Sequence, residues 1–170
     1  MSARVLIRWW SFAAVALLTF VAYSRLTAQP AVHAKPAAVS DSPPAVHLAN
    51  ISTRLAVGTG NNVLIAGFIV TGTQPKKIIV RGIGPSLPNI PNAMQDPTLE
   101  LHDGQGSVIA RNDNWMDSPN KQAIIDSTIP PSDPREAAIL YQLTPGSYTA
   151  IVRGKDNTTG VAVVEAYQLN

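Results

Sequence analysis

From Leu48 to its end, the chain is a succession of short runs rich in Val, Ile, Leu and Thr, separated by clusters of Gly, Pro, Asn and Asp. β-Branched residues fit pleated strands, whereas Gly, Pro, Asn and Asp favour turns. The turn clusters recur at roughly the 8–12-residue spacing that is typical of β-sandwiches. The pattern therefore predicts an all-β domain over residues 48–170, an antiparallel β-sandwich of about seven or eight short strands.

The closing stretch, Thr144–Leu169, carries the clearest strand pattern. Two runs, Ser147–Arg153 and Val161–Leu169, flank the polar segment Gly154–Gly160, and this arrangement predicts a β-hairpin. A second hairpin is predicted for Thr98–His102 and Ser107–Arg111, which the turn residues Asp103–Gly106 connect. In its first strand Leu99 and Leu101 are expected on the buried face.

The first half of the domain is less regular. Residues 48–57 alternate and predict a strand with one buried face. Residues 63–71 are nearly continuously apolar, which predicts a central strand covered on both faces, with Gly67 marking a bulge or a close backbone contact. Residues 76–81 predict a third strand, and the proline-rich segment 82–97 a long ordered loop.

Two later segments are ambiguous by pattern. Lys121–Asp126 fits one helical turn or a short strand equally well. Glu136–Leu143 contains good helix formers, but its length and the Pro145-Gly146 turn that follows favour a strand.

The N-terminus has the three parts of an export signal. Arg4 and Arg8 precede an apolar run, Trp9–Tyr23, and small residues follow, so cleavage is expected after Ala28 or Ala34. A retained N-terminal anchor is the alternative. Residues 29–47 are rich in Pro and Ala and show no apolar period, which predicts a spacer between the leader, residues 1–28, and the domain.

Charge and cysteine content narrow the partners. The leader holds three of the 13 Lys and Arg residues and none of the 11 Asp and Glu residues, so ten basic and 11 acidic residues remain. This balance gives no argument for nucleic acid as a partner, and no membrane contact is expected beyond the leader. Because the chain has no cysteine, thiolate metal sites and disulfides are excluded.

Two stretches resemble a known family. Asp96–Trp115 and Leu143–Leu169 place Leu99, Leu101, Asp103-Gly104, Pro145-Gly146 and Tyr148 on the pattern of the bacterial pre-peptidase C-terminal domain. The body from Leu48 also resembles uncharacterised exported bacterial proteins. These resemblances imply a jelly-roll-like β-sandwich and a secreted or cell-surface location, and they imply no catalytic activity.

A cluster of acidic and amide residues follows the second predicted hairpin. Calcium binds six to eight oxygen ligands, and loops at the end of a sandwich can gather them. The candidate calcium ligands are Asn112, Asp113, Asn114 and Asp117, with Asp96 or Glu100 nearby. Simple turn formation by the same Asx residues is the alternative. No other cofactor is predicted.

Trp115 lies in the polar sequence NDNWMD and is the candidate ligand-binding aromatic, because an exposed indole stacks on sugars or anchors a protein. The alternative is a plug over the core. His102 is expected on an outer strand face beside Asp103, and no Gly-x-Ser-x-Gly elbow occurs. The sequence thus predicts a non-enzymatic exported module with a structural or adhesive role. The alternative is a carbohydrate- or matrix-binding module, with calcium as a candidate stabilising ion and a polysaccharide or surface protein as partner.

Overall fold

A computed structural model describes residues 50–169, within which the chain forms eight strands, one short α-helix and two 3-10 turns. The predicted leader, residues 1–28, and the predicted spacer, residues 29–47, lie outside the described residues. In chain order the elements are β1 (Asn50–Val57), β2 (Leu64–Val70), β3 (Lys76–Ile83), β4 (Pro97–His102), β5 (Val108–Asn112), η1 (Trp115–Asp117), α1 (Lys121–Asp126), β6 (Ala137–Leu143), β7 (Gly146–Gly154), η2 (Lys155–Asn157) and β8 (Gly160–Leu169).

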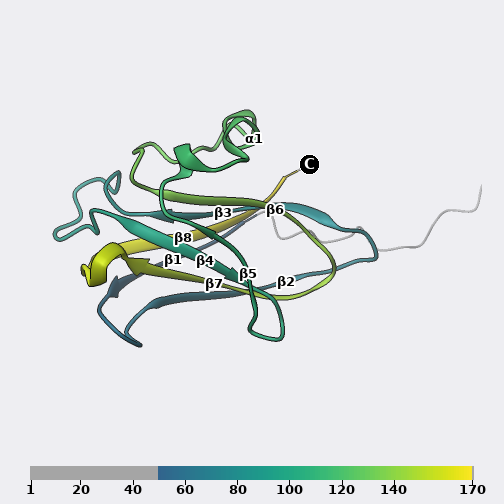
Figure 1. Ribbon diagram of the computed structural model, residues 1–170, viewed down its shortest axis with the longest axis horizontal. Helices are drawn as coiled ribbons and strands as arrows, with labels where there is room; N and C mark the ends of the chain where they lie inside the picture. Colours follow the sequence, from purple (N-terminus) through teal and green to yellow (C-terminus); the bar gives the residue numbers. More distant parts are fainter. Residues whose placement is uncertain (1–49, 170) are drawn as a thin grey trace, which may run out of the picture. The chain divides into compact units, whose positions relative to one another are not determined.

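The strands form two packed antiparallel sheets of four (Figure 1). Sheet A has the order β1-β8-β3-β6, and sheet B has the order β2-β7-β4-β5. Of the consecutive strands, only β4 and β5 pair within one sheet, whereas every other connection crosses between the sheets. This order is that of a jelly roll. The predicted jelly-roll-like β-sandwich is therefore confirmed.

The predicted hairpin at the end of the chain is wrong. β7 pairs with β2 and β4 in sheet B, while β8 pairs with β1 and β3 in sheet A. The connection crosses between sheets through η2, in which Asp156 and Asn157 adopt φ angles of 52° and 61°. A glycine is needed at Gly160, because a Cβ there would lie 2.7 Å from the Cα of Met94. The segment is an arch between sheets, and its strands do not touch as a hairpin.

The predicted position of the second strand is also wrong. β2 is one of the two edge strands of sheet B, with its even-numbered residues buried and its odd-numbered residues exposed. Ile65 and Ile69 face outward with 55% and 68% of their surface exposed. Gly67 makes no bulge, since the register with β7 runs unbroken from Leu64 to Val70. The continuous apolarity of β2 reflects a buried face and an apolar outer face, rather than a strand covered on both sides.

The main core lies between the two sheets. The inward residues of β4, Leu99 and Leu101, are fully buried there, as the alternation predicted. On β1 only Val57 is buried, and Leu55, on the same face, is 52% exposed. The predicted buried face of this strand is therefore only partly covered.

A second, smaller core lies on the outer face of sheet A. The segment between β5 and β6, with η1 and α1, lies over this face (Figure 1). Its Trp115 and Ile124 pack onto Ile79 and Ala138. The segment Lys121–Asp126 is helical, and β6 confirms the strand predicted over Glu136–Leu143. Residues 50–169 contain no helix long and apolar enough to span a membrane.

Candidate functional site

Two loops that the sequence separates by about forty residues meet at one end of the sandwich. The Lys155 ammonium in η2 lies 2.8 Å from Asp113 Oδ2 and 3.7 Å from Asp96 Oδ2. The Lys155 backbone N–H also donates to the Asp96 carbonyl at 2.9 Å. The hydrogen bond to Asp113, together with the charges of Asp113 and Asp96, raises the pKa of Lys155 above its ordinary value. We name this end, formed by residues 58–62, 84–96, 113–114, 133–136 and 155–159, the loop end.

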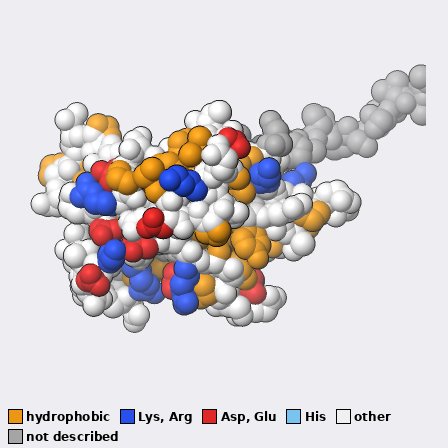
Figure 2. All heavy atoms as spheres, turned by 45° about the horizontal axis from the view of Figure 1, so that its top comes forward, with side chains coloured by type: hydrophobic (Ala, Val, Ile, Leu, Met, Phe, Trp, Pro, Cys, Tyr) orange, Lys and Arg blue, Asp and Glu red, His pale blue; other side chains and the backbone are white. Residues whose placement is uncertain are grey.

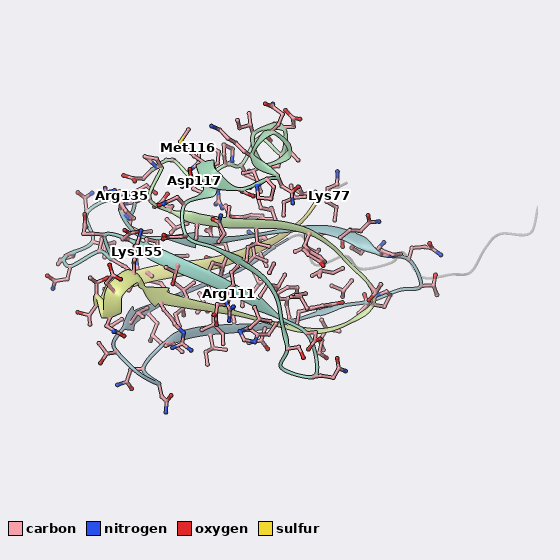
Figure 3. The ribbon with its side chains drawn as sticks, in the orientation of Figure 1. Lys77, Arg111, Met116, Asp117, Arg135 and Lys155 are labelled. Carbon is pink, nitrogen blue, oxygen red and sulfur yellow. The ribbon has the colours of Figure 1, made fainter. Side chains whose placement is uncertain are left out.

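The four predicted calcium ligands do not point toward one centre. Asn112 Oδ1 accepts the Ala138 N–H at 2.9 Å, and Asn112 Nδ2 donates to the Asn114 carbonyl. Asn114 Nδ2 donates to Asp117 Oδ2, whereas Asp113 pairs with Lys155. In Figure 3 Asp117 lies beside Met116 on the α1 side of the molecule, apart from Lys155 and Arg111. The four side chains thus have different partners.

This donor set does not fit a complete calcium shell. Asp96 Oδ1 and Asp113 Oδ1 are buried and have no hydrogen-bond partner among the described residues. Two carboxylates beside a lysine supply fewer oxygens than the six to eight that calcium takes. Within residues 50–169 no group of three or more His, Cys, Asp or Glu side chains converges as a metal site would require. Calcium binding stays a prediction, which thermal melting tests below.

Trp115 is buried rather than exposed. Only 7% of its surface is accessible, and its Nε1–H donates to the Asp133 carbonyl at 3.0 Å. Its backbone N–H donates to the Glu136 carbonyl at 2.8 Å. The ring fills the second core against sheet A, so its faces are not available for stacking on a ligand. The structure thus favours the alternative of a plug, located over sheet A instead of over the end of the main core.

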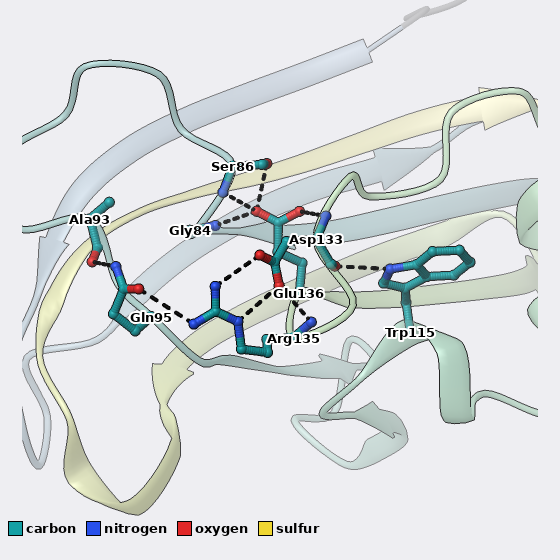
Figure 4. Close-up of polar contacts among 8 residues, drawn as sticks. All are labelled: Gly84, Ser86, Ala93, Gln95, Trp115, Asp133, Arg135 and Glu136. Carbon is teal, nitrogen blue, oxygen red and sulfur yellow. Dashed lines mark hydrogen bonds and ion pairs between the residues drawn. The ribbon is translucent and has the colours of Figure 1, made fainter.

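A buried carboxylate, which no pattern in the sequence singles out, organises the loop end. Glu136 is fully buried at the start of β6 (Figure 4). Its Oε1 accepts the Gly84 N–H at 3.0 Å, the Ser86 N–H at 3.0 Å and the Ser86 hydroxyl at 2.7 Å. Its Oε2 accepts the Asp133 N–H at 3.2 Å. Because four donors surround it, the carboxylate fastens two loops to β6 and is not presented to a substrate.

A second polar cluster fastens the segment between β5 and β6, which we name the outer segment, to sheet A. The Arg81 guanidinium on β3 pairs with Glu165 on β8 and donates to the Ile129 carbonyl at 2.8 Å. It also lies over the Tyr167 ring, 5.1 Å from the ring centroid. Arg81 is thus a mostly buried link between layers, and β3 continues to Ile83, two residues beyond the predicted strand.

The outer face of sheet B carries a charged cluster, formed by Arg111, Glu100 and His102. Arg111 Nε on β5 donates to Glu100 Oε1 at 2.8 Å, and this hydrogen bond is the main reason why the pKa of Glu100 is lowered. His102 Nε2 lies 3.2 Å from the other Glu100 oxygen, and its Nδ1 lies 3.1 Å from the Gly106 carbonyl. His102 is on the outer face, as predicted.

A shallow hollow lies beside this cluster. It has a volume of about 330 Å³ and is lined by Thr98, Leu99, Glu100, Arg111, Asn112 and Asp113. Its volume is at the lower end of the range of small-molecule sites. The hollow includes two of the predicted site residues, Asn112 and Asp113. The lining combines hydrogen-bonding side chains of both charges with more apolar than polar surface, which suits a ligand that carries both polar and apolar groups.

The charges on the visible surface are mixed. Figure 2 shows Lys and Arg side chains interspersed with Asp and Glu side chains, and not gathered into a stripe of one sign. The polyanionic backbone of a nucleic acid favours a continuous basic surface. The face in view therefore adds no support for nucleic acid as a partner.

No protein-family model matches this chain, and no curated protein matches it in sequence. Among solved structures, it is similar to the pre-peptidase C-terminal domain of a collagenase from Bacillus anthracis. The identity is 15% and the TM-score 0.44, over 69% of this chain and 89% of that one. At this level the likeness carries no conclusion about function.

Proposed function

We propose that this protein is an exported, non-enzymatic β-sandwich module with a structural or adhesive role at the cell surface or outside the cell. The observation that carries the proposal is how the carboxylates are used. Glu136 is held by four donors, Glu165 pairs with Arg81, and Glu100 pairs with Arg111. A general acid or base needs a carboxylate free to exchange a proton with a substrate. These three carboxylates instead hold loops and strands together.

Export is supported by the leader, in which Arg4 and Arg8 precede the apolar run Trp9–Tyr23. The test is to express the full chain with a C-terminal epitope tag in a bacterial host and to fractionate the cells. We expect the tagged protein outside the cytoplasm, shortened by cleavage after Ala28 or Ala34 or kept at its full length by a retained anchor. Full-length protein in the cytoplasmic fraction would contradict export.

The adhesive role is tested on the same cells. Cells that export the full chain are compared with cells that carry the empty vector for retention on surfaces coated with matrix polysaccharide or surface proteins. A structural or adhesive module predicts higher retention or altered aggregation of the exporting cells. Equal behaviour of the two populations on every surface would contradict this role.

The hollow on sheet B supports one alternative, a carbohydrate- or matrix-binding module. Hydrogen-bonding side chains around a cavity of about 330 Å³ suit a saccharide hydroxyl or a peptide amide. On an array of glycans and matrix proteins, binding by the full chain should be lost with Arg111→Ala. The matched control is Arg54→Ala, an exposed arginine on β1 of the other sheet, which should bind normally. Binding that both variants retain would exclude the hollow as the binding site.

A further inference from the structure

The sandwich has four edge strands, and three of them carry features that hinder pairing with another strand. On β6, the Ala138 N–H donates to Asn112 and the Leu140 carbonyl accepts from Asn120, so the outer segment occupies this edge. β5 is only five residues long, carries the exposed Arg111 and follows a register shift in its ladder with β4. β1 carries the exposed Arg54. Charges, bulges, short strands and covering segments are the usual protections of sheet edges.

Among the residues that the structure describes, nothing gives β2 any of these protections. Its seven residues, LIAGFIV, include no charge and no proline, and its register with β7 is unbroken. Within residues 50–169 it pairs only with β7, so alternate N–H and C=O groups on its other side point away from the sheet. Ile65 and Ile69 flank this edge on the outer face with 55% and 68% of their surface exposed. An edge of this kind is a template for an additional strand.

Leu55 provides an independent indication that a strand belongs there. It lies on the same face of β1 as Val57, which is buried in the main core, yet it is 52% exposed. β1 and β2 are the edge strands of the two facing sheets on this side of the sandwich, and they contact each other across the core. Because sheet B ends at β2, Leu55 has an incomplete layer opposite it. A strand added beside β2 would extend sheet B toward Leu55.

The sequence of β2 is symmetric in the way that self-pairing requires. Ile65 and Ile69 lie two residues to either side of Gly67, and all three face outward. If two copies pair antiparallel about Gly67, Ile65 of each copy lies opposite Ile69 of the second copy, and the two Gly67 residues face each other. A two-fold axis makes such an interface self-complementary. Since β2 carries no charge, the pairing brings no like charges together.

We propose that β2 is a self-association edge, at which two copies of this chain pair antiparallel about Gly67 and join their B sheets into one continuous sheet. A single strand pair gives a small interface, in the class below about 1,200 Å² that is typical of transient association. The dimer is therefore reversible and depends on protein concentration. Because no ion pair contributes, raising the salt concentration should not dissociate it.

Cysteine crosslinking tests both the surface and the register. The chain has no cysteine, so Gly67→Cys introduces a single thiol. The site has room for a side chain, since the nearest atom to a Cβ at Gly67 is the Tyr148 carbonyl oxygen at 4.0 Å. Directly opposed residues of an antiparallel pair have Cα atoms about 4.5–5.5 Å apart, within the range of a disulfide. Mild oxidation of cells that export the full-length variant should give a covalent dimer.

The register supplies matched controls. Ile65→Cys alone and Ile69→Cys alone should not crosslink, because each position lies about 14 Å from its own copy, four residues along the strand. The double variant Ile65→Cys/Ile69→Cys should crosslink. No dimer with Gly67→Cys would overturn the proposal, and so would equal crosslinking of all single variants or a product with the mass of a different protein.

A substitution test complements the crosslinking. Gly67→Lys places two lysines directly opposite each other across the strand pair and should raise the dissociation constant several-fold, because like charges at directly opposed positions destabilise the pairing. Val108→Lys is the control: it replaces an apolar residue, 37% exposed, on β5 at the opposite edge of sheet B, and should leave association unchanged. The readout is the mass of the purified exported protein by light scattering over a concentration series. A mass of one chain at every concentration for the unsubstituted protein would contradict the proposal.

Discussion

Replacing Glu136 should destabilise the domain strongly, because the loop end depends on this carboxylate. Glu136→Ala removes the acceptor of three backbone N–H groups and one hydroxyl. A buried donor left without a partner costs about 1–3 kcal/mol. The Gly84 N–H is the fully buried one, whereas water can reach the partly buried sites at Ser86 and Asp133. We therefore expect a loss of about 2–5 kcal/mol, from the unpaired Gly84 N–H, smaller contributions of the other donors and the cavity that the shorter side chain leaves.

A conservative variant separates hydrogen bonding from volume. Glu136→Gln can keep a carbonyl oxygen toward Gly84 and Ser86, but its NH₂ then faces the Asp133 N–H, and two donors cannot bond. With the charge also lost, the expected destabilisation is about 1.5–3 kcal/mol. The control is Asp126→Asn, an exposed residue on α1, which should change the free energy of unfolding by less than about 0.5 kcal/mol.

The assay is denaturant unfolding followed by tryptophan fluorescence. Trp115 is the only tryptophan in residues 50–169, and its ring and backbone bond to Asp133 and Glu136. Its emission therefore reports the loop end directly. The reasoning would be refuted by a Glu136→Ala variant whose free energy of unfolding lies within about 0.5 kcal/mol of the parent.

Four further outcomes are expected. Arg81→Met should lower the free energy of unfolding by about 2–4 kcal/mol, because it leaves Glu165 and the Ile129 carbonyl without their partly buried donor. Proteolysis between Ser118 and Asp133 should become faster, and unchanged protection of this segment would contradict the prediction. Because the pKa of Glu100 is lowered, the contribution of Glu100 to stability is present above the ordinary pKa of a carboxyl group and is lost as the pH falls through the lowered pKa. In an NMR titration, Arg111→Met should return the pKa of Glu100 toward its ordinary value. An unchanged titration would contradict the role of the Arg111 contact. Lys155→Met should speed amide exchange in both Asn112–Asp117 and Lys155–Asn157, whereas a change confined to one loop would show that Lys155 does not couple them. The calcium prediction requires a melting temperature that rises between chelator and millimolar calcium, and no shift would exclude it.

The strands and the fold class were predictable because they depend on local composition. Alternation and turn residues located β4, β5 and β6 closely, and a jelly roll needs about eight such strands. The pairing of β7 and β8 was not predictable in this way. A polar segment with glycines at both ends is common to a hairpin and to an arch between sheets. What separates them is the contact of Gly160 with Met94 and the left-handed Asp156 and Asn157, which depend on tertiary packing.

The candidate site was predictable only in part. Asn112 and Asp113 do line the hollow on sheet B, and Asp113 does meet the arch at Lys155. The roles of Trp115 and Glu136 depend on the segment between β5 and β6 folding back over sheet A, which residue types alone do not encode. A polar neighbourhood in sequence made Trp115 look exposed. An acidic residue before an apolar strand, Glu136, gave no indication of the donors at Gly84 and Ser86, which lie about fifty residues earlier.

The central claim is that Glu100, Glu136 and Glu165 serve the architecture of this domain and that the protein acts through its surfaces. The most direct test is to incubate the purified full-length product with panels of peptide, ester and glycoside substrates, beside the same protein after heat unfolding. We expect no turnover above that of the unfolded sample. Turnover by the folded protein that Glu100→Gln abolishes, while Asp126→Asn leaves it unchanged, would contradict the claim.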